Sequence, residues 1–159
     1  MQKLDALDLK LLACLQADNQ LTADTLADRV GRSPSAIARR LRRLRETGSV
    51  LADVAIVAEQ AVGHPLSAIV HVQLERHALG EVAKFKRQLA ASPNVQFCLE
   101  ISGAFDILLL VVVRDMDAFN LFADEILAGQ RAVRRYETSF VKRRLKASLA
   151  LPLDQLAEG

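Results

Sequence analysis

A run of arginines is the part of this sequence with the most evident binding chemistry. Residues 32–48, RSPSAIARRLRRLRETG, contain six arginines and no acidic residue before Glu46. Ile37, Leu41 and Leu44 recur at the spacing of one helix face, so the arginines gather on the other faces. Because the whole chain carries a net charge of only +2, this local charge favours a specific docking surface for an anionic partner over general adhesion.

The residues before the arginine run predict two further helices. Asp5 and Asp8 are spaced as an N-cap and its third helical residue, and this first helix should end near Asp18. Thr22 suits the N-cap of a second, short helix, and Gly31 suits the left-handed residue after its end. The basic helix therefore follows a short helix and a tight glycine turn.

The start and end of the basic helix are also marked. Ser33 followed by Pro34 is a strong start signal, and Gly48 should stop the helix. The β-rich segment 49–57, SVLADVAIV, predicts a short strand or wing. This is the layout of a winged helix-turn-helix, whose second helix enters the major groove of DNA. The alternative is a solvated basic face on an ordinary helical hairpin.

Residues near the start of such a helix lie closest to the base edges. We predict that Ser35, Ala36 and Arg39 read bases and that later arginines meet phosphates. Arg40 lies beside the apolar stripe, so we expect it in a structural ion pair. The predicted DNA-binding residues are Arg32, Ser33, Ser35, Ala36, Arg39, Arg42 and Arg43.

The second half of the chain changes period. Residues 58–65 have the character of a linker, and the following segments alternate between strand and helix patterns in the order βαββαβ, which is the ferredoxin-like pattern. The predicted strands cover 67–75, 95–102, 105–113 and 133–146, and the predicted helices cover 79–92 and 117–129. The third strand is apolar on both faces, but two helices cover only one face of a sheet. We therefore expect self-association through the other face.

Other classes of function find little support. The sequence has no P-loop, no dinucleotide-binding glycine motif and no metal-ligand cluster, so we expect no cofactor, no metal and no catalytic residues. Cys14 and Cys98 lie far apart and are expected to be buried free thiols. The N-terminus lacks a signal-peptide pattern, and the apolar run 107–113 is too short to span a bilayer, which favours a cytoplasmic protein without membrane contact.

Two blocks of the sequence resemble one known family. Residues 4–50 contain a Leu-Asp-x-x-Asp start, a Leu-x-x-Leu-Gln segment, the Leu-Ala of the second helix and the serine that opens the third, with Arg40, Leu44 and Gly48. Residues 102–119, SGAFDILLLVVVRDMDAF, contain a Ser-Gly-x-Phe-Asp turn and the strand after it. Both blocks resemble the Lrp/AsnC, or feast/famine, transcriptional regulators, over roughly residues 4 to 153.

The resemblance implies an α+β protein with an N-terminal winged helix-turn-helix (1–57), a linker (58–65), a ferredoxin-like, RAM/ACT-like effector domain (66–147) and a tail (148–159). It also implies sheet-mediated homodimers, their assembly into octamers or discs, and a small effector, usually an amino acid, bound near dimer–dimer contacts. The effector residues that it implies are Ser102, Gly103, Ala104, Phe105, Asp106, Met116, Thr138, Ser139 and Phe140. Asp106 is interpreted either as a cap for its own turn or as a contact for the effector's ammonium group.

Two features depart from the family pattern. Ala104 stands where many relatives have an acidic residue, so one contact to an amino group is missing. Residues 35–38, SAIA, differ from the segment of many relatives, so the operator sequence does not carry over.

Two other functions are known on the same fold. Siroheme decarboxylases are similar in fold and length, but their motifs include tryptophan, which this chain lacks, and His64, His71 and His77 form no evident site. RNA-binding RRM domains share the βαββαβ order but need aromatic residues on their third strand, which is aliphatic here after Phe105.

Overall fold

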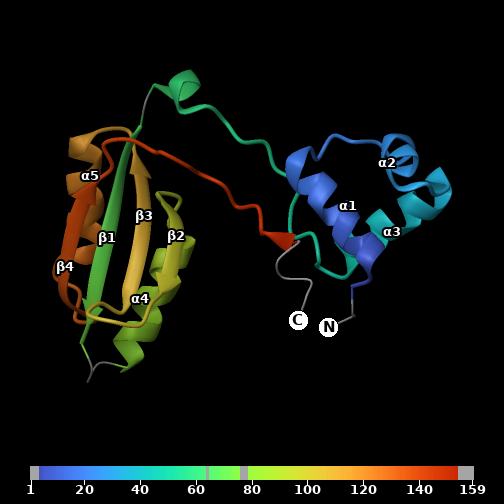
Figure 1. The fold of residues 1–159 in the computed structure, drawn as a ribbon. Coiled ribbons are helices and arrows are strands. Elements are labelled where there is room, and N and C mark those ends of the chain that lie inside the picture. The colour runs from blue at the N-terminus through green and yellow to red at the C-terminus, as the bar shows by residue number, and fades with distance from the viewer. Residues whose placement is uncertain (1–3, 64, 76–78, 154–159) are drawn as a thin grey trace. The chain divides into compact units, whose positions relative to one another are not determined.

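The computed structural model describes residues 4–63, 65–75 and 79–153. The chain folds into two compact units (Figure 1). One, here called the helical unit, comprises Met1–Ile56 together with Lys146–Gly159, and the other, the sheet unit, comprises Val57–Leu145. The C-terminal segment therefore packs with the first part of the chain rather than with the strand that precedes it.

The helical unit is built from α1 (Ala6–Ala17), α2 (Ala23–Val30) and α3 (Pro34–Glu46). Each predicted cap is present: Asp5 and Asp8 form a capping box, and Thr22 accepts from the backbone N–H of Thr25. Gly31 adopts a left-handed φ of 64° at the end of α2, which a residue without Cβ does at little cost. The core contains the predicted stripe of α3 and the leucines of the other helices: Leu11, Leu15, Leu26, Ala27, Ile37, Leu41 and Leu44.

The prediction of a strand over 49–57 is wrong. Residues 51–58 form no regular element, and Leu51 and Ile56 are each 94% exposed. β-branched residues favour a strand only where a neighbouring strand supplies hydrogen bonds and a packing surface. The four described strands all pair with one another in the sheet unit. Segment 49–57 therefore has no neighbouring strand among the described residues. An exposed ion pair between Arg45 and Asp53 (2.9 Å) and a hydrogen bond from the backbone N–H of Val50 to Leu44 O (3.0 Å) connect segment 49–57 to α3.

The sheet unit has the predicted βαββαβ order. A short 3-10 helix, η1 (Glu59–Val62), precedes β1 (Leu66–Leu74), α4 (Leu79–Ala91), β2 (Val95–Glu100), β3 (Ile107–Val113), α5 (Met116–Phe122) with a π-helical turn η2 (Ala123–Leu127), and β4 (Val133–Phe140). The sheet order is β2-β3-β1-β4, and all pairs are antiparallel.

The last strand is shorter than the predicted range 133–146. It ends at Phe140, which pairs with Ala68, and the backbone N–H of Val141 donates to Ser67 O (2.9 Å). β1 begins at Leu66, so residues from Lys142 onward have passed the end of the strand that would pair with them.

Both helices of the sheet unit lie on one face of the sheet (Figure 1). Alternate residues of β1 and β3, such as Val70 and Leu109, pack under Phe85 of α4 and Phe119 of α5. The remaining residues point to the opposite face, here called the open face. It comprises apolar Ile69, Phe97, Leu99, Leu108, Leu110 and Val112, and polar His71 and Gln73 on β1 with Arg135, Glu137 and Ser139 on β4. No helix among the described residues has both the length and the apolar character that crossing a membrane requires.

Candidate nucleic-acid interface and effector site

The core stripe of α3 fixes which of its residues face outward. Ser33 caps the helix by accepting from the backbone N–H of Ala36 (3.4 Å), with Pro34 in the first turn. With Ile37, Leu41 and Leu44 buried, the opposite side is left to the polar residues. Of the predicted DNA-binding residues, Arg32, Ser33, Ser35, Arg39 and Arg42 are exposed, and Ala36 and Arg43 are half-buried.

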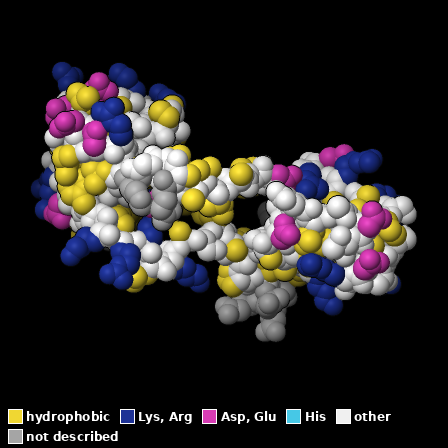
Figure 2. All heavy atoms as spheres, turned by 90° about the horizontal axis from the view of Figure 1, so that it is seen from above, with side chains coloured by type: hydrophobic (Ala, Val, Ile, Leu, Met, Phe, Trp, Pro, Cys, Tyr) yellow, Lys and Arg dark blue, Asp and Glu magenta, His cyan; other side chains and the backbone are white. Residues whose placement is uncertain are grey.

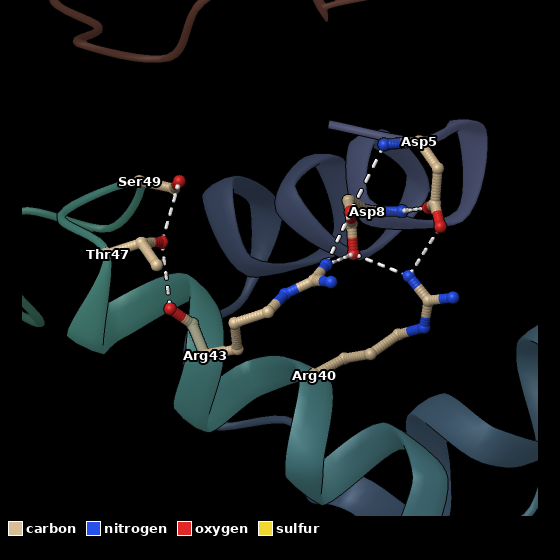
Figure 3. A network of polar contacts seen from close by, with 6 residues as sticks. All are labelled: Asp5, Asp8, Arg40, Arg43, Thr47 and Ser49. Atoms are coloured by element: carbon tan, nitrogen blue, oxygen red, sulfur yellow. Dashed lines mark hydrogen bonds and ion pairs between the residues drawn. The ribbon is translucent and has the colours of Figure 1, made fainter. Parts of the chain in front are cut away.

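The other two central arginines of α3 bind acids at the start of α1 (Figure 3). Asp8 is only 1% exposed, and its Oδ1 lies 2.8 Å from Arg40 Nη1 and 2.6 Å from Arg43 Nη2. Arg40 Nη1 also donates to Asp5 Oδ2 (2.7 Å), and Asp8 Oδ2 accepts from Arg43 Nη2 (2.6 Å). The capping box of α1 thus also anchors α3.

The charges in this network stabilise one another. The backbone N–H of Asp8, followed by the Arg40 guanidinium, lowers the pKa of Asp5, and the bond to Asp5 raises the pKa of Arg40. Because the folded pKa of Asp5 is lowered, its contribution to stability is present above the ordinary carboxyl pKa. It is lost as the pH falls through the lowered value.

The network confirms the predicted structural role of Arg40 and gives Arg43 a contact that the sequence did not reveal. Arg43 was expected at a phosphate, yet its guanidinium is bonded to Asp8. Residues three apart on a helix lie on the same face, so the spacing of Arg40 and Arg43 was the available signal. Thr47 supports this end of α3 by donating to the Arg43 carbonyl (2.8 Å).

The predicted effector turn connects β2 to β3. Ser102, Gly103 and Ala104 are exposed, and Gly103 has a φ of 142° that disfavours side chains with Cβ. Asp106 Oδ2 accepts from the backbone N–H of Leu74 on β1 (2.7 Å), so its carboxylate ties the turn to the neighbouring strand instead of capping the turn locally.

An aromatic and basic cluster adjoins this turn. The centres of the Phe105 and His71 rings are 5.3 Å apart. The guanidinium carbon of Arg135 lies 5.0 Å from the centre of the Phe105 ring. Arg135 also donates to Gln73 Oε1 (3.1 Å) and pairs with Glu137 (3.3 Å). Sequence reasoning missed His71 and Arg135, because their approach to Phe105 depends on the strand register.

One chain does not bring all predicted effector residues together. The turn 102–106 lies beside Val72 and Leu74 on β1, whereas Met116 follows Val113, which pairs with Leu66 at the opposite end of that strand. At about 3.3 Å per residue the two groups are separated by about 20 Å.

The third predicted effector segment, 138–140, divides between the two faces of the sheet. Thr138 pairs with buried Val70, and Phe140 packs edge-on against Phe119 (5.1 Å), so both face the helices. Ser139 pairs with Ile69 on the open face. The buried Thr138 hydroxyl has no hydrogen-bond partner among the described residues.

The described part of the chain contains no cluster of three His, Cys, Asp or Glu side chains suited to a metal ion. Cys14 and Cys98 are free thiols, as predicted, but both are half-buried rather than buried. Burial, followed by the charge of Glu100, raises the pKa of Cys98, so this thiol has little thiolate character at neutral pH.

Comparison with known proteins places both units. Residues 4–50 match the family described as winged helix-turn-helix DNA-binding, and residues 67–151 match the family described as the Lrp/AsnC ligand binding domain. An uncharacterized HTH-type transcriptional regulator of Sinorhizobium fredii is 38% identical over 96% of this chain and 90% of its own length. The Bkd operon transcriptional regulator of Pseudomonas aeruginosa is 31% identical over 96% of this chain and all of its own length.

Solved structures give the same result. A transcriptional regulator from Neisseria meningitidis, in complex with L-methionine, superposes with a TM-score of 0.88 at 32% identity, covering 97% of this chain and 99% of that one. An AsnC family regulator from Agrobacterium tumefaciens gives 0.87 at 29% identity, covering 96% and 99%. These relatives are regulators rather than enzymes, so the decarboxylase alternative finds no support. The chain belongs to the Lrp/AsnC family and is a DNA-binding transcriptional regulator.

Proposed function

We propose that this regulator binds a specific operator through the exposed face of α3 and that a small amino-acid-type effector at the sheet unit controls that binding. The observation that supports DNA binding is that the arginines of α3 fall into two groups with different contacts. Arg40 and Arg43 bind Asp8, while Arg39 and Arg42 remain exposed beside Ser35. The proposed recognition surface is therefore smaller than the arginine count suggests.

Arg39 and Arg42 are expected to contribute differently to DNA binding. Arg39 is nearer the start of α3 and is assigned to a base edge, so Arg39→Ala should change sequence preference at a cost of about 1–3 kcal/mol at one base pair. Arg42 is assigned to a phosphate, so Arg42→Ala should weaken binding to all sequences and reduce the salt slope by about one. Equilibrium binding to a panel of single-base variants, at several salt concentrations, measures both effects. Identical base preferences for the two variants and the parent would contradict the assignment of Arg39.

An amino acid is the effector class that the site chemistry favours. A relative was solved with L-methionine, and in the turn 102–106 the exposed residues 102–104 are proposed to offer backbone N–H groups to a carboxylate, with the Asp106 side chain for an ammonium group. Ala104 removes one acidic contact, so the exact amino acid is left to the test. Because Met116 and the turn are far apart in one chain, we propose that residues from different protomers complete the site.

Asp106→Asn is the variant that separates the two roles of this residue. An amide oxygen still accepts from the backbone N–H of Leu74, so the turn should remain folded, whereas the charge for an ammonium group is lost. We expect unchanged DNA affinity without effector and loss of the response to added amino acid. The measurement is operator binding by parent and variant against a panel of L-amino acids that includes L-methionine. A variant that responds to the same compound at the same concentration as the parent would leave Asp106 as a turn residue only.

Self-association belongs to the same proposal. The open face carries apolar Ile69, Leu108 and Leu110 beside polar residues of β4, and a second copy of the sheet is the partner that we propose for it. The dimers are proposed to assemble further into octamers or similar particles. Binding to DNA also requires the compartment that holds the DNA, which is consistent with the cytoplasmic location expected from the sequence.

A further inference from the structure

Both connections to the helical unit leave the sheet unit at the same end of the sheet. The chain arrives through residues 51–58 and η1, and it departs after β4. The N–H of Val141 donates to Ser67 O, which places the departing chain beside the start of β1. Both connecting segments carry exposed apolar side chains, including those of Ile56 and Leu145. Figure 2, in which hydrophobic side chains are yellow, shows such side chains exposed on the face that it draws. Contacts at this end of the sheet decide how many residues of each connecting segment are held against the sheet unit and how many are free.

One guanidinium holds the two connections together. Arg144 Nη1 lies 2.8 Å from Glu59 Oε1 on the arriving segment, and Arg144 Nη2 donates to Ser67 Oγ on β1 (2.9 Å). Ser67 is 6% exposed, and the Glu59 oxygen is buried although its side chain is partly exposed. Two nitrogens of one planar group thus make two contacts that the single ammonium of lysine does not reproduce.

The neighbouring residue provides a natural comparison. Arg143 lines the same open cleft of about 430 Å³ as Arg144, together with Glu59 and Ser67. It is exposed and takes part in none of the ion pairs of the described residues. The two arginines carry the same charge in the same cleft, but only Arg144 joins the two connections.

We propose that Arg144 is a positioning residue whose contacts with Glu59 and Ser67, here called the clasp, set the lengths of the two connections between the units. With the clasp closed, the arriving connection is limited to residues 51–58; opening it extends that connection to 51–65. On the departing side, Leu151 is fixed to Gln16 of α1 by two hydrogen bonds (2.7 and 3.1 Å). Opening the clasp would therefore extend the departing connection from 145–150 to 141–150.

The consequence follows from paired DNA binding, so the inference rests on the proposed function. In a dimer on two half-sites, the second helical unit binds at an effective concentration that the connections determine. This concentration falls roughly as the −3/2 power of the connecting length. Nearly doubling the arriving connection should weaken binding to two half-sites by about 2.5-fold. Binding to a single half-site uses only one helical unit and should not change.

The experiment uses full-length protein and a duplex that the parent selects from random sequence, with one half-site scrambled as the single-site control. Arg144→Lys keeps the charge but loses the fork, and Glu59→Ala removes the other side of the clasp. Both should weaken binding to two half-sites by about 2.5-fold and leave single-site binding as in the parent. Arg143→Lys is the matched control and should bind both duplexes as the parent does. Hydrogen exchange of backbone amides 59–63 should rise in the two clasp variants only.

Each other outcome overturns the inference in a recognisable way. If Arg144→Lys binds both duplexes like the parent and its exchange is unchanged, there is no clasp. If Glu59→Ala strengthens binding to both duplexes, Arg144 acts as a phosphate contact that the acid restrains. If both duplexes weaken equally, the variants damage the fold generally. If the parent itself does not prefer two half-sites, the proposed paired binding is wrong, and the proposed role of the clasp, which depends on it, is wrong as well.

Discussion

Asp8→Ala is expected to destabilise the helical unit by about 3 kcal/mol, near the lower end for removing one partner of a buried ion pair. The carboxylate is 1% exposed and holds both Arg40 and Arg43, so its loss removes the buried ion pairs between α1 and α3. The two arginine side chains are 29% and 37% exposed, so they regain water and moderate the cost. The sheet unit should keep its stability, because none of these residues lies in it.

The measurement is backbone hydrogen exchange at increasing urea concentrations, which reports the unfolding of the two units separately. Asp5→Ala is the matched control: it removes an exposed acid from the same network, so its effect should be clearly smaller. Operator affinity of Asp8→Ala should fall with the stability, because α3 loses its support. Parent-like exchange protection in α1 and α3 of the Asp8 variant would show that the ion pairs do not hold these helices together.

Leu110→Asp is expected to abolish the dimer. Leu110 lies in the middle of the open face, between Ile69 on β1 and Phe97 on β2. A carboxylate there remains hydrated in a single chain but would be buried without a partner in a sheet-to-sheet interface, at a cost of several kcal/mol. The variant should therefore be a folded monomer at concentrations where the parent is at least a dimer.

Light scattering with circular dichroism separates loss of assembly from loss of fold. Leu121→Asp is the control: this leucine is 63% exposed on α5, on the covered side of the sheet, and the variant should still dimerise. Leu99→Asp, on the open face at the edge strand, should repeat the effect of Leu110→Asp. A parent that is monomeric at micromolar concentration, or a Leu110 variant that remains a dimer, would rule out the open face as the interface.

Local signals in the sequence were sufficient wherever the contacts that fix an element are local. The Ser33-Pro34 start of α3 and the Asp5/Asp8 capping box depend on residues within one turn, and the structure confirms them. The alternation of 67–75 predicted β1, and the apolar run of 105–113 predicted β3, which lies between β2 and β1 in the sheet.

The failures all involve partners distant in sequence. Segment 49–57 has strand composition but no neighbouring strand among those described, and β4 ends where β1 begins. The bond of Arg43 to Asp8 spans 35 residues. The register of β4 with β1 decides which face of the sheet Thr138 and Ser139 occupy. The sequence therefore predicted the effector segments but not the distances between them.

Selection of binding sites from random duplex DNA by the full-length protein is the most direct test of the central claim, that α3 reads a specific operator as one half of a symmetric pair. We expect one enriched motif with two half-sites related by two-fold symmetry, their centres about 10 base pairs apart or a multiple of that spacing. Repeating the selection with Arg39→Ala should change the enriched bases within each half-site. A pool without an enriched sequence, or one enriched identically by parent and variant, would contradict sequence reading by α3.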